Sequence, residues 1–379
     1  MRTSVAATLD QPLLAAVRLG RLTLPNRVVM APLTRARASN EDRTPTELHT
    51  AYYAQRASAG LIVTEGTWVS ERAVGFLNVP GIHSDAQVAA WRRVTDVVHA
   101  VGGRIVQQLW HSGAASHPDH LGGALPAGPS AVNPHEQSFT AEGFKATPTP
   151  RAMTPADIAD TVAEFRRAAA NARRAGFDGV EIHALGSSLF PQFLNPRLNR
   201  RTDAYGGDPA RRRRLLLEVV DAVAEAWDGQ GPGVRLSPYW SAACFAPDPE
   251  SLADYEALVV ALNDHPVTYL HLRGRDLEAP GARPDTEAIA RYRRLFDGPC
   301  IANLGFDRES GNAAVARGVA DAVAYGTAFV ANPDLVERFA LGRELAAGDP
   351  TTYYAGGAEG YADYPASTTG TTTTRVTQN

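Results

Sequence analysis

One stretch decides the fold, and it reads EIHALGSSLFPQFLNPRLNRRTDAYGG, from Glu181 to Gly207. It completes a short apolar run that starts at Gly179 and predicts a buried strand. His183 therefore falls at the carboxyl end of that strand, where parallel α/β proteins place their chemistry. Pro191 and Pro196 interrupt regular structure, so the rest of the stretch is predicted to be loop rather than helix. A loop this long inside a compact domain usually has a binding or catalytic role.

The rest of the chain repeats one unit, a short apolar run followed by a loop and an amphipathic helical stretch. Eight apolar runs are predicted to be strands: Arg27 to Ala31, Leu61 to Thr64, Arg104 to Leu109, Gly179 to His183, Gly233 to Ser237, Tyr269 to Leu272, Cys300 to Asn303 and Ala322 to Tyr325. Helices are predicted at Pro45 to Ser58, Asp85 to Val101, Pro155 to Ala175, Asp208 to Trp227, Pro249 to Asn263, Asp285 to Phe296, Arg308 to Arg317 and from Pro333 onward. Eight alternating βα units predict a (β/α)8 TIM barrel rather than an open doubly wound sheet.

One connection is much longer than the others. After the third predicted strand the chain runs from Trp110 to Met153, and this segment is rich in glycine and proline. We expect a lid or hairpin over the barrel mouth. A disordered insertion is the alternative, although Phe139 and Phe144 give the segment side chains that can pack. The whole chain is predicted to form a single barrel domain over residues 1–365, followed by a disordered Thr-rich tail over 366–379.

The composition excludes several classes of function. The chain has 379 residues, of which 44% are hydrophobic and 21% charged, and its formal net charge is −4. That charge argues against nucleic acid or an anionic membrane as the main partner. Cys244 and Cys300 cannot form a disulfide framework, and no Cys/His cluster has zinc spacing, so no metal is predicted and a reduced, cytoplasmic setting is expected. No apolar run approaches the roughly 20 residues that span a bilayer.

The stretch that opens at Glu181 resembles a segment of the old yellow enzyme family, the FMN-dependent ene-reductases. That segment reads His-x-x-Asn-x-Tyr-Leu-x-x-Gln-Phe-Leu and then Asn-x-Arg-x-Asp-x-Tyr-Gly-Gly. The matching residues are His183, Leu189, Gln192, Phe193, Leu194, Asn199, Arg201, Asp203, Tyr205, Gly206 and Gly207. Two positions differ. Gly186 stands where the family has the Asn that binds the substrate carbonyl together with the His, and Ser188 stands where it has the proton-donating Tyr.

The resemblance implies an FMN site at the strand ends. Pro32 and Thr34 belong to a segment whose Thr lies beside the flavin in the family, although a Thr here could also simply cap a turn. Ala59 and Gly60 end a segment that matches the family stretch whose backbone approaches the flavin pyrimidine ring, and small residues suit such an approach.

Two further residues are implied to bind the flavin ring. Gln108 falls where the family has an amide that pairs with the N3 and O2 edge, because an amide presents a donor and an acceptor side by side. Arg235 matches the Arg placed near N1 and O2, where a permanent positive charge stabilises the anionic reduced flavin. A buried Arg without an anionic partner is costly, which weakens a purely structural interpretation of Arg235.

The sequence departs from the family at the phosphate end of the implied site. Leu304 and Gly305 stand where family members have paired glycines, and Gly326 and Thr327 stand where they have Gly-Arg. Leu304 places a bulky side chain where backbone should approach a phosphate, and Thr327 removes a cation that would grip it. We therefore expect a lower FMN affinity than is typical of the family.

The resemblance implies an FMN-dependent oxidoreductase that uses NAD(P)H and acts on an α,β-unsaturated carbonyl or a related unsaturated small molecule. The catalytic candidates are His183, Ser188 and Tyr361, the last of which is expected to project into the substrate pocket. Because one polarising donor and the usual proton donor are missing, two alternatives stay open. One is a redox-neutral isomerase or cyclase on the same barrel, with flavin lost or merely structural, and the other is a non-catalytic binding protein.

Overall fold

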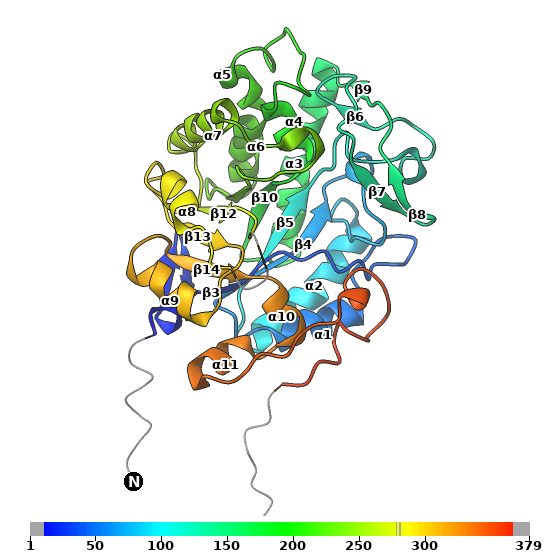
Figure 1. Ribbon diagram of the computed structural model, residues 1–379. Helices are drawn as coiled ribbons and strands as arrows, with labels where there is room; N and C mark the ends of the chain where they lie inside the picture. The colour runs from blue at the N-terminus through cyan, green and yellow to red at the C-terminus, as the bar shows by residue number, and fades with distance from the viewer. Residues whose placement is uncertain (1–10, 278, 280–281, 367–379) are drawn as a thin grey trace, which may run out of the picture.

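Eight parallel strands close into a barrel in the computed structural model, which describes residues 11–277, 279 and 282–366 (Figure 1). Around the barrel the strands are β3 (Val28–Met30), β4 (Leu61–Trp68), β5 (Ile105–Trp110), β10 (Gly179–Ala184), β11 (Gly233–Leu236), β12 (Tyr269–Arg273), β13 (Cys300–Asn303) and β14 (Ala322–Tyr325). The predicted (β/α)8 barrel is confirmed, and each predicted strand overlaps one of these eight. The predicted tail lies outside the described residues from residue 367 onward.

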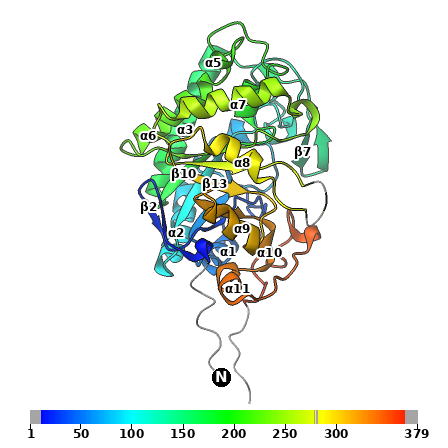
Figure 2. The same cartoon turned by 60° about the vertical axis from the view of Figure 1, so that its left-hand side comes forward.

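Helices cover the outside of the barrel (Figures 1 and 2). They are α1 (Glu47–Gln55), α2 (Asp85–Ala100), α3 (Pro155–Arg174), α5 (Pro209–Arg212), α6 (Arg214–Ala226), α7 (Pro249–Leu262), α8 (Thr286–Arg293), α9 (Arg308–Ala316), α10 (Thr327–Ala331) and α11 (Leu335–Leu341). Several begin at a side-chain cap, and Ser84, Thr154 and Asp307 each accept a hydrogen bond from a first-turn N–H. In the described part of the chain no helix is both long enough and apolar enough to cross a bilayer.

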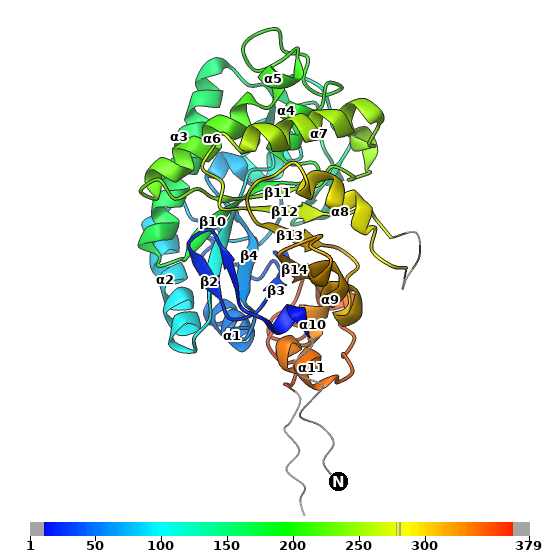
Figure 3. The ribbon, with the colours of Figure 1, turned by 90° about the vertical axis from the view of Figure 1, so that its left-hand side faces the viewer.

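A hairpin closes the amino-terminal end of the barrel. Strands β1 (Val17–Leu19) and β2 (Leu22–Leu24) pair antiparallel, and Figure 3 shows this hairpin against the barrel strands. Its buried leucines join the inward-facing side chains of the barrel in one apolar cluster: Leu19, Leu22, Leu24, Val29, Ala31, Leu61, Val63, Val106, Tyr269, Ile301, Ala322 and Ala324. Because this floor is filled with side chains, the site has to lie at the opposite end, at the carboxyl ends of the strands.

The long connection after β5 is folded. It contains β6 (Ala127–Gly128), the antiparallel hairpin of β7 (Gln137–Thr140) and β8 (Gly143–Ala146), and β9 (Arg151–Ala152). The Phe139 ring packs at 4.8 Å from Phe144 and at 5.0 Å from Phe76. A hairpin is therefore present and the disordered alternative is wrong, whereas the position of the segment over the barrel mouth and its action as a lid stay predictions.

The stretch after β10 differs from its prediction, because it contains a short helix, α4 (Leu189–Leu194). Pro191 is the third residue of this helix, a position whose N–H would have no intrahelical partner in any case. The proline is therefore tolerated. All six residues of α4 are buried, and this packing fixes the chain that follows His183.

Candidate active site

Three buried polar side chains connect across the inside of the barrel below its mouth. Glu181 on β10 is the register partner of Gln108 on β5, so both side chains face inward. The Gln108 Nε2 donates to Glu181 Oε1 at 2.7 Å, and Glu181 Oε2 lies 2.9 Å from Nδ1 of His271 on β12. Glu181 and His271 were not predicted as site residues. The signal was present in the sequence, because a charged residue inside a buried apolar strand is rare without a partner.

Glu181 is a carboxylate and His271 is a neutral imidazole in this arrangement. Burial alone would raise the pKa of Glu181, but His271, Arg235 and the Gln108 hydrogen bond outweigh burial and hold that pKa below its ordinary value. Burial lowers the pKa of His271 despite the neighbouring carboxylate. The Nε2 of His271 has no hydrogen-bond partner, which agrees with a single proton on Nδ1 that points at Glu181.

Arg235 lies on β11 beside this layer and is also buried. Its Nη2 donates to the side-chain oxygen of Asn303 on β13 at 2.8 Å, and its Nε has no partner. Burial lowers the pKa of Arg235 to about 10, so the side chain stays a cation at neutral pH. The structure therefore presents a buried positive charge with one free donor at the barrel mouth.

His183 is the register partner of Arg235 on the next strand, and it is half-buried. Its ring centroid lies 5.1 Å from that of Trp110, and its Nδ1 lies 3.2 Å from Ser188 Oγ. Burial lowers the pKa of His183 to about 3, and the charge of Arg235 acts in the same direction. His183 is thus neutral across the physiological range, with one ring nitrogen held by Ser188.

Ser188 and Gly186 sit beside His183 in the predicted order, but neither extends a side chain into the mouth. Ser188 is buried, and its hydroxyl is 2.9 Å from the Leu185 carbonyl oxygen as well as close to the His183 ring. Gly186 has φ +64°, and a Cβ there would meet the Trp240 ring at 3.6 Å, an ordinary contact distance. The structure makes Ser188 a partner of His183 and leaves space at Gly186.

Ala59 and Gly60 do not reach the barrel mouth, which corrects the prediction. They precede β4 and lie at the opposite end of the barrel, where Gly60 N donates to the Val28 carbonyl oxygen at 2.9 Å. A Cβ on Gly60 would lie 2.0 Å from the Asn26 carbonyl oxygen, so glycine is needed there for packing. The small residue at the mouth is instead Gly66 on β4, the register partner of Gln108.

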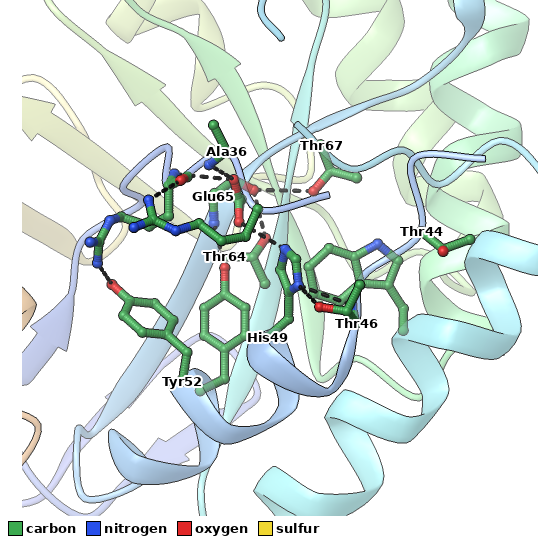
Figure 4. A network of polar contacts seen from close by, with 12 residues as sticks. Ala36, Thr44, Thr46, His49, Tyr52, Thr64, Glu65 and Thr67 are labelled. Atoms are coloured by element: carbon green, nitrogen blue, oxygen red, sulfur yellow. Dashed lines mark hydrogen bonds and ion pairs between the residues drawn. The ribbon is translucent and has the colours of Figure 1, made fainter. Parts of the chain in front are cut away.

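Pro32 and Thr34 lie in the loop after β3 and directly precede Arg35 and Ala36. Ala36 belongs to a buried polar network around Glu65 (Figure 4). Glu65 on β4 holds this loop, because its Oε2 accepts from the backbone N–H groups of Arg35 at 3.2 Å and Ala36 at 3.3 Å. Ala36 has φ +54°, an uncommon conformation that these two bonds help to fix. Thr34 is half-buried next to them, as expected of a residue at the edge of the mouth.

Tyr361 belongs to the same network and does not project into a pocket beside His183. It is fully buried, its ring stacks on Tyr52 at 4.1 Å, and the Arg35 and Arg37 guanidiniums lie 5.1 Å and 4.9 Å from its centroid. Arg35 and Arg37 also donate to backbone carbonyls of the segment before Tyr361, including Gly360 at 2.7 Å. These hydrogen bonds hold the carboxyl-terminal segment against α1 and keep the Tyr361 side chain buried there.

The loops after β13 and β14 lie side by side, since these strands are neighbours in the barrel. Leu304 has φ +95°, a conformation that a bulky residue adopts only at a cost, and Gly305 follows with φ +77°. Gly326 precedes α10, and Thr327 is exposed at its start. The four predicted phosphate residues are therefore brought together, without a cation among them.

The sequence model of the NADH:flavin oxidoreductase / NADH oxidase family matches residues 12–346 of this chain. The chain belongs to this family, that of the old yellow enzyme. Within it, the protein is 40% identical to putative 12-oxophytodienoate reductase 4 of Oryza sativa subsp. japonica over 95% of this chain and 94% of the relative. It is 36% identical to the flavin oxidoreductase hxnT of Emericella nidulans over 94% of this chain and 97% of the relative.

Solved structures of the old yellow enzyme family superpose on most of the chain. Morphinone reductase matches with a TM-score of 0.88 and 42% identity, covering 95% of this chain and 97% of that one. The old yellow enzyme homologue of Zymomonas mobilis matches with a TM-score of 0.87 and 37% identity, covering 93% and 99%. The protein is thus an oxidoreductase of an FMN-dependent, NAD(P)H-using family.

FMN fits the ring end of this family member's site better than the phosphate end. Arg235 Nε is a buried donor without a partner, and the Gln108 side-chain oxygen is kept away from Glu181 by the bond of its nitrogen. These two groups would hold the N1, O2 and N3 edge of the flavin. At the phosphate end, the strained Leu304 and the uncharged Thr327 offer backbone and hydroxyl donors only.

Proposed function

We propose that this FMN-dependent oxidoreductase uses NAD(P)H to reduce a carbon–carbon double bond conjugated to a carbonyl in a small molecule. The observation that carries the proposal is the placement of His183 and Arg235 as register partners on β10 and β11. One is a neutral imidazole and the other a buried cation. A neutral donor suits a substrate carbonyl, and a fixed positive charge suits a reduced flavin.

His183 would bind the carbonyl oxygen through Nε2–H. This requires the Ser188 hydroxyl to turn from the Leu185 carbonyl oxygen, to which it donates at 2.9 Å, and to donate its hydrogen bond to His183 Nδ1 instead, because a neutral imidazole carries only one proton. The 3.2 Å separation of Nδ1 and Oγ permits that bond. Ser188 therefore acts through His183, because its hydrogen bond to Nδ1 would leave the proton on Nε2.

Gln108 and Arg235 would orient the cofactor. When bound, FMN supplies the hydride chemistry, accepting from NAD(P)H and donating to the substrate. Gln108 contributes an amide oxygen whose direction Glu181 fixes, and Arg235 contributes charge and its free Nε donor. Gln108 and Arg235 would thus bind and orient the cofactor, and neither transfers a proton in the proposed reaction.

Solvent water is the proton source that we propose for the substrate α-carbon. Ser188 is buried and close to the Leu185 carbonyl, Tyr361 is sealed in its network, and His111 Nδ1 accepts from Gly113 N at 2.9 Å. Burial lowers the pKa of His111 to about 3, which makes it a poor acid donor at neutral pH. A positioned general acid contributes about 10² to 10⁴ in rate, so turnover of simple enones should be slow.

Relatives support the carbonyl part of the proposal. The curated relatives are named reductases of 12-oxophytodienoate, and the solved structures include a reductase of morphinone. Both names denote molecules that carry a ketone. By analogy, a ketone or aldehyde is the group that we expect His183 to bind.

The test is a spectrum followed by a turnover assay. The purified protein should show oxidised flavin absorbance that disappears on adding NADPH or NADH without oxygen and returns on adding cyclohexenone. The His183→Ala protein should still bleach with the nicotinamide but recover slowly with the enone. A protein that stays colourless after incubation with excess FMN would overturn the proposal.

A further inference from the structure

A second guanidinium reaches the barrel mouth from β12. Side chains alternate along a strand, so Arg273 faces inward like His271 and Tyr269, and its register partner is Asn303 on β13. Its Nη2 is ion-paired with Asp276, and the guanidinium lies 4.9 Å from the Trp240 ring centroid. Its Nη1 is buried and has no hydrogen-bond partner. Two neighbours thus hold the group in place and leave one donor open.

This donor lies between the two parts of the site already described. Trp240, on which Arg273 stacks, is the ring that a Cβ at Gly186 would touch, so it borders the space beside His183. Asn303, the register partner of Arg273, accepts the hydrogen bond of Arg235. Arg273 is also close enough that its charge disfavours protonation of Arg235. Two cations therefore face one mouth.

A buried donor without a partner is costly, and a ligand that supplies an acceptor removes that cost. A guanidinium binds oxyanions best, because its planar fork matches carboxylate and phosphate geometry. Arg273 keeps its stem packed and only 13% of its side chain exposed, so it is pre-organised for such a ligand.

We propose that Arg273 binds an oxyanion at the barrel mouth through Nη1. Two sources share this chemistry. One is a carboxylate on the substrate, which would make the substrates unsaturated acids or enones that carry an acid, and this source rests on the proposed function. The other is the phosphate of FMN, for which Thr327 provides no cation.

The experiment compares Arg273→Gln with wild type, using Arg275→Gln as the matched control. Arg275 also stacks on an aromatic ring, at 4.6 Å from Tyr239, and also pairs with a carboxylate, Asp285 at 3.2 Å, but its side chain is 54% exposed. Isothermal titration measures trans-cinnamate and trans-cinnamaldehyde binding to the FMN-loaded protein. The apo protein is titrated with FMN and with riboflavin, which lacks the phosphate.

Arg273→Gln should weaken the binding of one anion, trans-cinnamate or FMN, by at least tenfold. The affinity for its neutral counterpart, trans-cinnamaldehyde or riboflavin, should change by less than twofold. Loss confined to cinnamate identifies a substrate carboxylate, and loss confined to FMN identifies the phosphate. Arg275→Gln should change neither. Unchanged affinity for both anions in a variant with wild-type thermal stability would overturn the proposal.

Two further measurements keep the test decisive. If Arg273→Gln does not fold, Arg273→Lys keeps the charge without the fork and should still weaken the same anion at least threefold, and an unchanged affinity overturns the proposal. If wild-type protein binds no FMN, the proposed function fails. The oxyanion site is then tested by titrating cinnamate into the apo protein, where equal binding by wild type and Arg273→Gln overturns it.

Discussion

The side-chain nitrogen of Gln108 is committed to Glu181 at 2.7 Å, from one barrel strand to the next. An amide presents a donor on one side and an acceptor on the other, so this bond decides which of them Gln108 offers at the mouth. The carboxylate also acts to raise the pKa of Arg235, against the lowering by burial. Glu181 therefore influences both groups that we assign to the flavin ring, although it does not itself lie at a strand end.

Glu181→Gln should raise the reduction potential of bound FMN by tens of millivolts. Removing a buried negative charge favours the anionic reduced flavin. One unit charge at roughly 8 Å and an effective dielectric constant of about 20 is worth about 2 kcal/mol, and about 30 mV corresponds to about 1.4 kcal/mol for two electrons. Spectroelectrochemistry measures the shift. An unchanged potential in a variant that retains FMN would separate Glu181 from the flavin.

His183→Ala should lower kcat/KM for cyclohexenone at least about tenfold, or about 1.4 kcal/mol, because the carbonyl loses its donor. His183→Asn, which keeps a donor, should recover part of the loss. Since the pKa of His183 is lowered to about 3, wild-type kcat/KM should show no histidine ionisation between pH 5 and 8. A wild-type profile with a midpoint near 6.5 that His183→Ala abolishes would contradict the neutral assignment.

Gly186→Asn should raise kcat/KM for cyclohexenone by about tenfold or more, because a second donor to a developing oxyanion can contribute about 2.7 to 4 kcal/mol. The left-handed backbone at φ +64° suits asparagine, and the space beside Trp240 accepts a Cβ. Gly186→Ala is the control for the added Cβ, because it has no donor, although alanine is more strained than asparagine at this backbone. Equal activity of the two variants would show that the added amide does not reach the carbonyl.

The double variant Leu304→Gly, Thr327→Arg should bind FMN at least about tenfold more tightly. Glycine removes the cost of φ +95°, and arginine adds a charge-assisted hydrogen bond of about 1.5 to 3 kcal/mol to the phosphate. Quenching of FMN fluorescence gives the affinity, and riboflavin should show no gain from Thr327→Arg. Wild-type affinity in the double variant would place the phosphate elsewhere, and Arg273 would be the first residue to examine.

Glu65→Gln should remove a pH dependence of stability. Burial raises the pKa of Glu65 to about 7. The native state therefore binds this proton more tightly than the unfolded state, and its contribution is complete below about pH 4.5 and is lost as the pH rises towards 7. Glutamine keeps the acceptor for Arg35 N and Ala36 N without the charge, so the variant should gain a few kcal/mol over wild type at pH 8 and little at pH 5. Denaturant unfolding at both values checks this, and parallel pH profiles would contradict it.

Most of the barrel was predictable because each strand is a short, mainly apolar run, the pattern of strands buried on both faces. The end of β4 was not, since Glu65, Gly66 and Thr67 interrupt the apolar run and are residues common in loops. Because the predicted strand ended at Thr64, Gly66 was not recognised as a residue of the barrel mouth. For the same reason Glu65 was not recognised as the residue that holds the Thr34 loop.

The site was only partly predictable for related reasons. A glycine required by packing against Asn26 looks the same in sequence as one required by a flat ligand, so Gly60 was placed at the wrong end. Glu181 and His271 are 90 residues apart, and nothing local pairs them. Tyr361 matched in sequence order, but two arginines more than 320 residues earlier decide where its ring lies.

The leucine-filled hairpin beneath the barrel has a kinetic consequence. Because β1 and β2 fill the amino-terminal end of the barrel with side chains, we expect the nicotinamide and the unsaturated substrate to enter at the same carboxyl end. If the two bind in the same space, the nicotinamide has to leave before the unsaturated substrate enters, so the protein stores the reducing electrons between the two half-reactions. Double-reciprocal plots at several fixed NADPH concentrations should be parallel. High concentrations of either reactant should inhibit, because that reactant would occupy the barrel mouth when the other one has to bind.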